Sequence, residues 1–277
     1  MPLQQPHQHL IVAMPIEAKA LLPFFGLKKL THAPTFEVYR RDNLWLTISG
    51  IGKVASAAAV AYTYMLAGHN SFSSWLNVGI AGHGHVELGD LFAAHKITDG
   101  DTGHSHYPSL TYTLPCQTEE VFTVPKPVTD YPAHGLFEME ASGFYYTATR
   151  FTSNELVQCL KVVSDTHHHP IESITPAWIE QNIKHHLESI EQVLQSQKAL
   201  LDELEVAHHI PNNFEAIAQK WRFSQQQKMQ LQQLLRRWHL IWGDTASVES
   251  AISNCRSSRE CLQTLRNTLH QQPTTLD

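Results

Sequence analysis

Acidic residues and glycines follow apolar runs, or open a predicted helix, at five places in the sequence. These segments are Met14–Glu17, Gly50–Lys53, Gly79–Gly82, Glu138–Glu140 and Ser164–Asp165. Carboxylates can donate or accept a proton while a bond is broken. Because ligands of open α/β sheets bind beyond the carboxyl ends of the strands, we expect Glu17, Glu140 and Asp165 to meet in one cleft.

Each segment also has a purely structural explanation. Gly50 and Gly52 lack the third glycine of a dinucleotide fingerprint, and Gly79–Gly82 lacks the ending of a phosphate-binding loop, so both are typical of ordinary strand-to-helix turns. Glu17 and Glu140 would stabilise helix N-termini through the helix dipole, and Asp165 could be a helix N-cap. No single segment therefore specifies a function.

Short apolar runs alternate with helical patterns through the first two thirds of the chain, which is typical of β-α units around a mostly parallel sheet. The alanine-rich stretch Lys53–Leu66 and the stretch Glu140–Phe151 are predicted to be helices lying on that sheet. The predicted strands are Leu10–Ala13, Leu44–Ser49, Trp75–Val78, Leu91–Ala94, Leu110–Leu114 and Leu156–Val163.

The pattern changes at Thr175, which precedes Pro176 like an N-cap followed by proline at the first helical position. Apolar residues at helical spacing predict a helix from there to about Leu204: Trp178, Ile183, Leu187, Ile190 and Leu194. A glutamine-rich helix follows, broken at Gly243, with one apolar face made of Leu231, Leu234, Leu235, Trp238 and Ile241. We place a domain boundary near residue 206, between an α/β domain (1–205) and a helical C-terminal extension (206–277).

Composition excludes several classes of protein. The 277 residues contain no apolar run long enough for a membrane helix, and the first residues lack the pattern of a signal peptide, so we expect a cytoplasmic protein without membrane contact. The four cysteines lack C-x-x-C spacing and predict reduced thiols. Residues 206–277 carry 8 Lys and Arg against 5 Asp and Glu, too sparse a basic patch for a nucleic-acid partner.

Taken in order, the motifs resemble those of the 5′-methylthioadenosine/S-adenosylhomocysteine nucleosidases, within the nucleoside phosphorylase and nucleosidase superfamily. The opening segment from Ala13 to Leu22 is similar to the family's first motif, and Glu138–Ala141 resembles its Met-Glu ribose motif. The other matches are Ser49–Val54, Asn77–Gly82 with Gly89 and Asp90 downstream, and Val163–Asp165. The resemblance covers about residues 9–205 and implies a three-layer α/β/α fold with a central, mostly parallel but mixed sheet.

The resemblance also implies roles for individual residues in cleaving a purine N-ribosidic bond without a cofactor. Asp165 would be the general acid that protonates purine N7, which requires a raised pKa. Glu17 would position and deprotonate the attacking water, and Glu140 would accept hydrogen bonds from the ribose hydroxyls. Further contacts to the small-molecule nucleoside are expected from Met139, Met14, Ile51, Ala81, Gly82, Lys161 and Phe122.

The first motif favours water over phosphate as the nucleophile. Phosphorylases of the superfamily present a phosphate loop with glycine and arginine after the first strand, whereas this chain has Met14–Glu17, whose carboxylate would repel phosphate. Two positions depart from the family: Ile80 stands where a serine is usual, and Lys161 where an arginine is usual. The segment between Asp101 and Phe137 is also short, and within it Phe122 is our candidate for stacking on the base.

Nineteen histidines are unusual for this length. Several are predicted to lie in loops near the same strand ends: His83, His85, His104, His106 and His167–His169. Without a cysteine or carboxylate at metal-ligand spacing, the pattern favours solvated loop histidines, and we predict no metal site. One of His83, His85 or His167 could instead bind a sugar hydroxyl.

Three functions compete. The first is a purine nucleosidase, and the second is a phosphorylase or a hydrolase of an unusual nucleoside. The third is a non-catalytic nucleoside-binding or scaffold protein that uses the helices of residues 206–277 to hold a partner. Retention of all three acids favours an enzyme, while Ile80 and the shortened segment favour changed specificity. A homodimer is an arrangement that the sequence leaves open.

Overall fold

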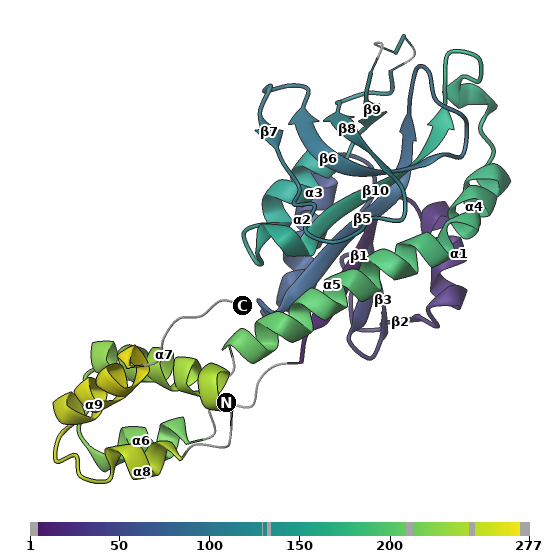
Figure 1. The fold of residues 1–277 in the computed structure, drawn as a ribbon. Coiled ribbons are helices and arrows are strands. Elements are labelled where there is room, and N and C mark those ends of the chain that lie inside the picture. Colours follow the sequence, from purple (N-terminus) through teal and green to yellow (C-terminus); the bar gives the residue numbers. More distant parts are fainter. Residues whose placement is uncertain (1–4, 129, 132–133, 209–212, 244–246, 272–277) are drawn as a thin grey trace. The chain divides into compact units, whose positions relative to one another are not determined.

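The computed structural model describes residues 5–128, 130–131, 134–208, 213–243 and 247–271. The chain divides into two compact units, residues 1–202 and 203–277 (Figure 1). Helix α5 (Leu187–His208) begins in the first unit and ends in the second.

One mixed sheet forms the centre of the first unit. Strand β1 (His7–Val12) pairs in parallel with β4 (Leu44–Ile48) and β5 (Ser73–Gly82), and β5 pairs in parallel with β10 (Val157–Asp165). Beyond β10 the sheet closes on itself through β6 (Leu91–Asp99), β8 (Gln117–Thr123) and β9 (Leu136–Glu138), because β9 returns to pair with the end of β5. The outer strands are β2 (Lys28–Lys29), β3 (Glu37–Arg41) and β7 (Ser105–His106).

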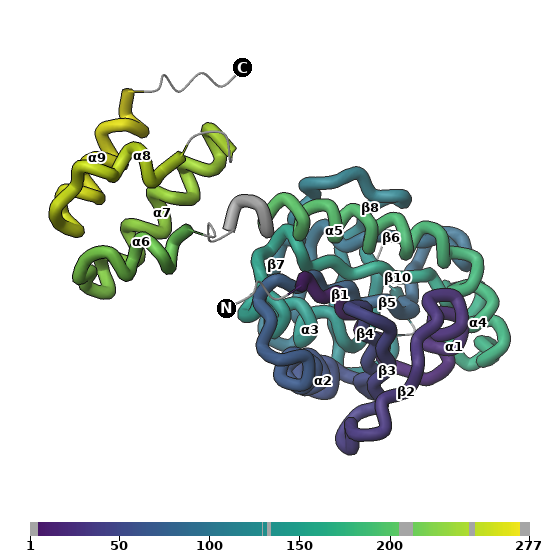
Figure 2. Tube along the Cα trace, turned by 90° about the horizontal axis from the view of Figure 1, so that it is seen from below, coloured from purple at the N-terminus to yellow at the C-terminus, as the bar shows by residue number. Residues whose placement is uncertain are grey.

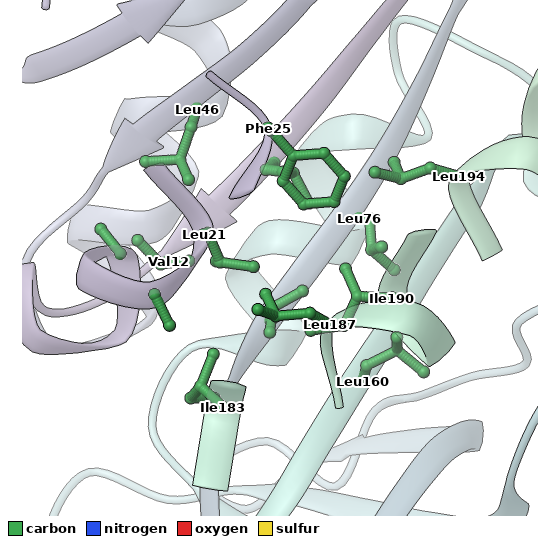
Figure 3. Packing of buried hydrophobic residues seen from close by; sticks show 14 of the residues in the cluster. Val12, Leu21, Phe25, Leu46, Leu76, Leu160, Ile183, Leu187, Ile190 and Leu194 are labelled. Carbon is green, nitrogen blue, oxygen red and sulfur yellow. The ribbon is translucent and has the colours of Figure 1, made fainter. Parts of the chain in front are cut away.

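Helices cover both faces of the sheet because successive side chains of each strand point to opposite faces. Leu10 and Val12 of β1 belong to a buried cluster with α1 (Pro15–Phe24), α4 (Pro176–His185) and α5, which Figure 3 shows in close-up. Ile11, between them, belongs to the opposite cluster. That cluster includes α2 (Lys53–Leu66) and α3 (Ala141–Ala148), which lie side by side on the other face (Figure 2).

The predicted strand Leu110–Leu114 is wrong. These residues are irregular in the structure, and the strand that enters the sheet is β8, a few residues later. Leu110 is exposed, whereas Tyr112 and Leu114 pack against the buried cluster of α1, α4 and α5. Apolar residues at alternate positions can thus anchor a loop, while β8 begins Gln-Thr-Glu-Glu and lacks the apolar pattern of a strand.

The helix predicted from Thr175 to about Leu204 is two helices, α4 and α5. Thr175 caps α4 as expected, accepting a hydrogen bond from the Trp178 N–H, and Pro176 is its first residue. The break lies at His186, whose Nε2 is 2.6 Å from the carbonyl oxygen of Gly89. This contact fixes the corner between the two helices.

The second unit contains α6 (Phe214–Lys220), α7 (Gln225–Trp242), α8 (Val248–Ile252) and α9 (Ser258–His270), which share a core of their own. The predicted apolar face of α7 is buried in that core except for Ile241, which is 45% exposed. In the described parts of both units, no helix has the length and apolar character needed to span a membrane.

Candidate active site

A cavity of about 360 Å³ opens at the carboxyl ends of β1, β5 and β10. Its walls come from the turn after β1, the last residues of β5 and β10, the start of α3 and the segments before and within α4. The lining residues are Ala13, Met14, Ile16, Glu17, Ile51, Ile80, Ala81, Gly82, Val124, Pro127, Val128, Tyr131, Phe137, Glu138, Met139, Glu140, Ser164, Asp165, Ile171, Ile174, Pro176 and Ile179.

The structure brings most of the residues that the sequence singled out to this one cavity. The three acids Glu17, Glu140 and Asp165 all line it, although they are far apart in the sequence. The same holds for Met14, Ile51, Ala81, Gly82 and Met139. Lys161 and Phe122 are not among the lining residues.

The Glu17 carboxylate is buried and held by backbone amides. Its Oε2 accepts hydrogen bonds from the N–H groups of Ala13 and Met14 at 2.8 and 2.9 Å, and its Oε1 accepts one from Ile80 at 3.1 Å. Burial raises the pKa of Glu17, while these amides and the charge of Lys161 oppose the rise. A carboxylate held in this way can take up a proton from a bound water.

Gly79 is what allows this arrangement. A Cβ atom at this position would lie 2.9 Å from Glu17 Oε1 and 3.5 Å from Lys161 Nζ. The glycine therefore leaves the space in which the acid and the ammonium group approach each other.

Lys161 lies beneath the cavity, with its side chain 1% exposed, and forms an ion pair with Glu138 at 2.8 Å. Burial alone would lower the pKa of Lys161, but Glu138 and Glu140 raise it, so the ammonium form is retained. Lys161 was predicted to contact the substrate. In the structure it instead supports the acids of the cavity from beneath the wall. Lys161 is a cation shared among buried acids.

Glu138 and Glu140 have different surroundings at the start of α3. The Glu138 carboxylate accepts hydrogen bonds from the N–H groups of Glu140 and Ala141 and from the Thr123 hydroxyl at 2.6 Å. Glu140 Oε1 accepts one from the Gly52 N–H at 2.8 Å. Burial, together with the negative charge of Glu138, raises the pKa of Glu140 to about 7.

Asp165 ends β10 on the other side of the cavity. Its Oδ1 accepts a hydrogen bond from the Ser164 hydroxyl, and its Oδ2 accepts one from the Tyr131 hydroxyl. Burial raises the pKa of Asp165 to about 6, with a smaller contribution from Glu172. A carboxyl group with such a pKa can carry a transferable proton near neutral pH.

Phe122 is not the aromatic residue of the cavity. Its ring stacks on Phe137, with 5.2 Å between ring centroids, and Phe137 is the residue that reaches the cavity wall. Tyr131 is the second lining aromatic, and sequence reasoning missed both. The shortened segment was the correct region to search, but no spacing within it distinguishes Phe137 or Tyr131 from Phe122.

No histidine is among the described residues that line the cavity. His83 is buried and stacked near Phe92, its Nδ1 accepts a hydrogen bond from the His85 N–H, and burial lowers its pKa. His167 lies behind Tyr131, with 5.6 Å between the ring centroids. Among the described residues, no group of three or more His, Cys, Asp and Glu side chains is arranged to hold a metal ion.

Neither a protein-family model nor a curated protein sequence matches the chain significantly, but solved structures do. The 5′-methylthioadenosine nucleosidase of Arabidopsis thaliana matches with 16% identity and a TM-score of 0.53, over 71% of this chain and 96% of that one. A 5′-methylthioadenosine nucleosidase from Helicobacter pylori matches with 13% identity and a TM-score of 0.59, over 70% and 100%. The futalosine hydrolase of Helicobacter pylori matches with 13% identity and a TM-score of 0.56, over 69% and 98%.

The chain has the nucleosidase fold. This confirms the mixed α/β fold with a central sheet that the sequence motifs predicted. The nucleosidase fold places the cavity at the strand ends where α/β proteins bind their ligands.

Proposed function

We propose that this protein hydrolyses the N-glycosidic bond of a purine nucleoside of the 5′-methylthioadenosine or S-adenosylhomocysteine type. The observation that carries the proposal is the convergence of Glu17, Glu140 and Asp165 on one largely apolar cavity. The relatives in fold, named as nucleosidases of 5′-methylthioadenosine and as futalosine hydrolase, support the same reaction class.

The three acids suit three parts of the reaction. Asp165 gives its proton to the base as the glycosidic bond breaks. The electron pair of that bond leaves with the base. Glu140 accepts hydrogen bonds from ribose hydroxyls and offsets the positive charge that develops on the sugar. Water then forms the new bond to the ribosyl carbon, and its proton passes to Glu17.

The charges of the cavity favour water over phosphate as the nucleophile. Among the described lining residues, the charged side chains are all carboxylates: Glu17, Glu138, Glu140 and Asp165. The ammonium group of Lys161 is already paired with Glu138 beneath the wall. A phosphate dianion would therefore meet negative charge without a cation to bind it.

The apolar wall supports a nucleoside with an apolar 5′-substituent. Ile80, at the position where the family usually has a serine, lines the cavity together with Ile16, Ile171, Ile174 and Ile179. Met14 and Met139 add flexible thioether surface. The substrate range is tested by incubating the protein with 5′-methylthioadenosine, S-adenosylhomocysteine, adenosine and inosine, with and without phosphate.

Separation of the products by reverse-phase chromatography identifies the free base. The proposal expects base release without phosphate and a preference for the apolar 5′-substituent. Release that depends on phosphate would instead indicate a phosphorylase.

The remaining sequence-based expectations accompany this proposal. For the fold, we expect a three-layer α/β/α arrangement with a helical extension from about residue 206. For the protein as a whole, we expect a cytoplasmic location and no cofactor, nucleic-acid partner or membrane contact. A homodimer is also kept as a proposal. Sedimentation measurements on the full chain test whether it forms a homodimer.

A further inference from the structure

Both carboxyl oxygens of Asp165 accept hydrogen bonds from hydroxyl groups of the protein. Ser164 donates to Oδ1, and Tyr131 donates to Oδ2. A purine N7 is an acceptor, so the carboxyl oxygen that faces it must carry a proton and donate it. A hydroxyl that donates to the same oxygen favours the ionised carboxylate and so opposes that proton.

Tyr131 is the less restrained of the two hydroxyls. Both Ser164 and Tyr131 line the cavity. Ser164 lies in the same strand as Asp165, and its Oγ is also 3.3 Å from the Ala81 carbonyl oxygen, so it is anchored in the sheet. Tyr131 belongs instead to the connection between β8 and β9, so Oδ2 is the oxygen whose donor is the freer to move.

The surroundings of Tyr131 fit a side chain held against Asp165. Its ring lies between Phe137 and His167, at centroid distances of 5.9 and 5.6 Å. Gly82 lies beside the contact, since a Cβ atom there would be 2.6 Å from Asp165 Oδ2 and would overlap the Tyr131 hydroxyl. The absence of a side chain at Gly82 is what allows the two groups to meet.

We propose that Tyr131 is a positioning residue for the general acid: its hydroxyl holds the Asp165 carboxylate before a nucleoside binds and yields Oδ2 to the leaving base. This inference rests on the proposed function for the identity of the entering group. Two hydroxyl donors favour the ionised form of the carboxyl group, and an N7 acceptor favours the protonated form. Base binding is therefore coupled to uptake of one proton from solvent by Asp165, and that proton is the one later transferred to N7.

Other titratable groups lie near this carboxyl group. Glu172 adds negative charge to it from the segment before α4. His83 is adjacent through a backbone hydrogen bond from its N–H to the Asp165 carbonyl oxygen at 2.9 Å, and His167 contacts Tyr131. Glu17 and Glu140 lie around the same cavity. A Tyr131→Phe substitution leaves all of these groups in place, so a comparison with the wild type isolates the hydroxyl.

The test is a ¹³C NMR titration of the Asp165 side-chain carboxyl in the full chain, with the signal assigned by its loss in Asp165→Asn. In Tyr131→Phe the titration midpoint should rise by about one pH unit, because one hydrogen bond to the charged form is lost. Tyr145→Phe is the matched control, since its buried hydroxyl bonds Asn154 away from the cavity, and it should leave the midpoint unchanged. An unchanged midpoint in Tyr131→Phe would overturn the proposal.

A second measurement replaces the first if the Tyr131→Phe protein fails to fold. Uniform incorporation of 3-fluorotyrosine replaces only one ring hydrogen of each tyrosine by fluorine, keeps every hydroxyl and makes it a stronger donor. The Asp165 midpoint should then fall, and no change would count against the proposal. Neither titration needs a substrate, so both remain decisive if no nucleoside is cleaved. Where a nucleoside is cleaved, Tyr131→Phe should shift the alkaline limb of kcat/KM, which reports the free enzyme, and leave that of kcat in place.

Discussion

Asp165, Glu17 and Glu140 share one cavity, yet each is held differently, and this difference gives each acid its own mutational signature. Asp165→Asn keeps the shape of the side chain and removes the transferable proton. We expect base release to slow by about 10²–10⁴-fold, the usual contribution of general acid catalysis, while nucleoside binding is retained. Single-turnover rates and equilibrium binding of the same nucleoside separate the two effects. An unchanged rate would move the acid to another residue, with His167 the first to examine.

Glu17→Gln and Glu140→Gln should differ in their effect on binding. In the proposed mechanism Glu17 acts on water, which matters in the transition state more than in the ground state, so its variant should lose turnover and keep ligand affinity. The same mechanism has Glu140 contact the ribose hydroxyls in both states, so its variant should lose affinity and rate together. Calorimetric binding beside steady-state kinetics measures both quantities. Equal losses of affinity in the two variants would contradict these assignments.

At the scale of elements, Gly79 in β5 is predicted to be essential to the geometry of Glu17. Gly79→Ala places a methyl group 2.9 Å from Glu17 Oε1 if nothing moves, so the carboxylate must shift away from its amide donors. Turnover should fall by at least about tenfold, because small displacements of a catalytic group are costly in rate. The thermal unfolding midpoint measures whether the fold is kept. Wild-type turnover in Gly79→Ala would show that this contact is unimportant.

The ion pair between β10 and the start of α3 should be a stability determinant. Lys161→Met leaves the buried Glu138 carboxylate without its cation, which costs about 3–5 kcal/mol of unfolding free energy in comparable buried pairs. Adding Glu138→Gln to the same protein removes the unpaired charge and should restore part of the loss. Urea unfolding of the three proteins measures both steps. A double variant less stable than Lys161→Met would contradict a charge-based account.

Sequence patterns predicted the elements that carry regular apolar spacing and missed those that do not. The helix Lys53–Leu66 has the predicted bounds, and strands β1, β5 and β10, which end at the cavity, were expected. Strand β8 was missed because its first four residues, Gln-Thr-Glu-Glu, are polar, and β9 because three residues show no period. Tyr131 and Phe137 reach the cavity through the closure of the sheet, which depends on pairing between distant strands and leaves no local signal.

At the scale of the whole molecule, the acids of the cavity make stability depend on pH. The folded pKa of Glu140, about 7, lies above its ordinary value of 4.5, so the folded state binds more protons between these values. The stability contributed by the protonated group is present at low pH and lost as pH rises through about 7. Glu140→Gln cannot ionise and keeps an oxygen that can accept the Gly52 hydrogen bond.

We therefore expect Glu140→Gln to unfold like the wild type near pH 4.5 and to be more stable, by about 2 kcal/mol, near pH 8. Denaturant unfolding at the two pH values measures the difference. A variant destabilised by the same amount at both pH values would show that ionisation of Glu140 does not cost the folded protein stability.

The central claim, that the acid at the end of β10 drives hydrolysis of a purine nucleoside, is tested most directly by phosphate-free release of base by two proteins. Wild type and Asp165→Asn are incubated with 5′-methylthioadenosine, and free adenine is quantified by reverse-phase chromatography. The account predicts adenine from the wild type without phosphate, and a rate at least about 10² times lower from Asp165→Asn. Equal adenine release by the two proteins, or release by the wild type only when phosphate is added, would contradict it.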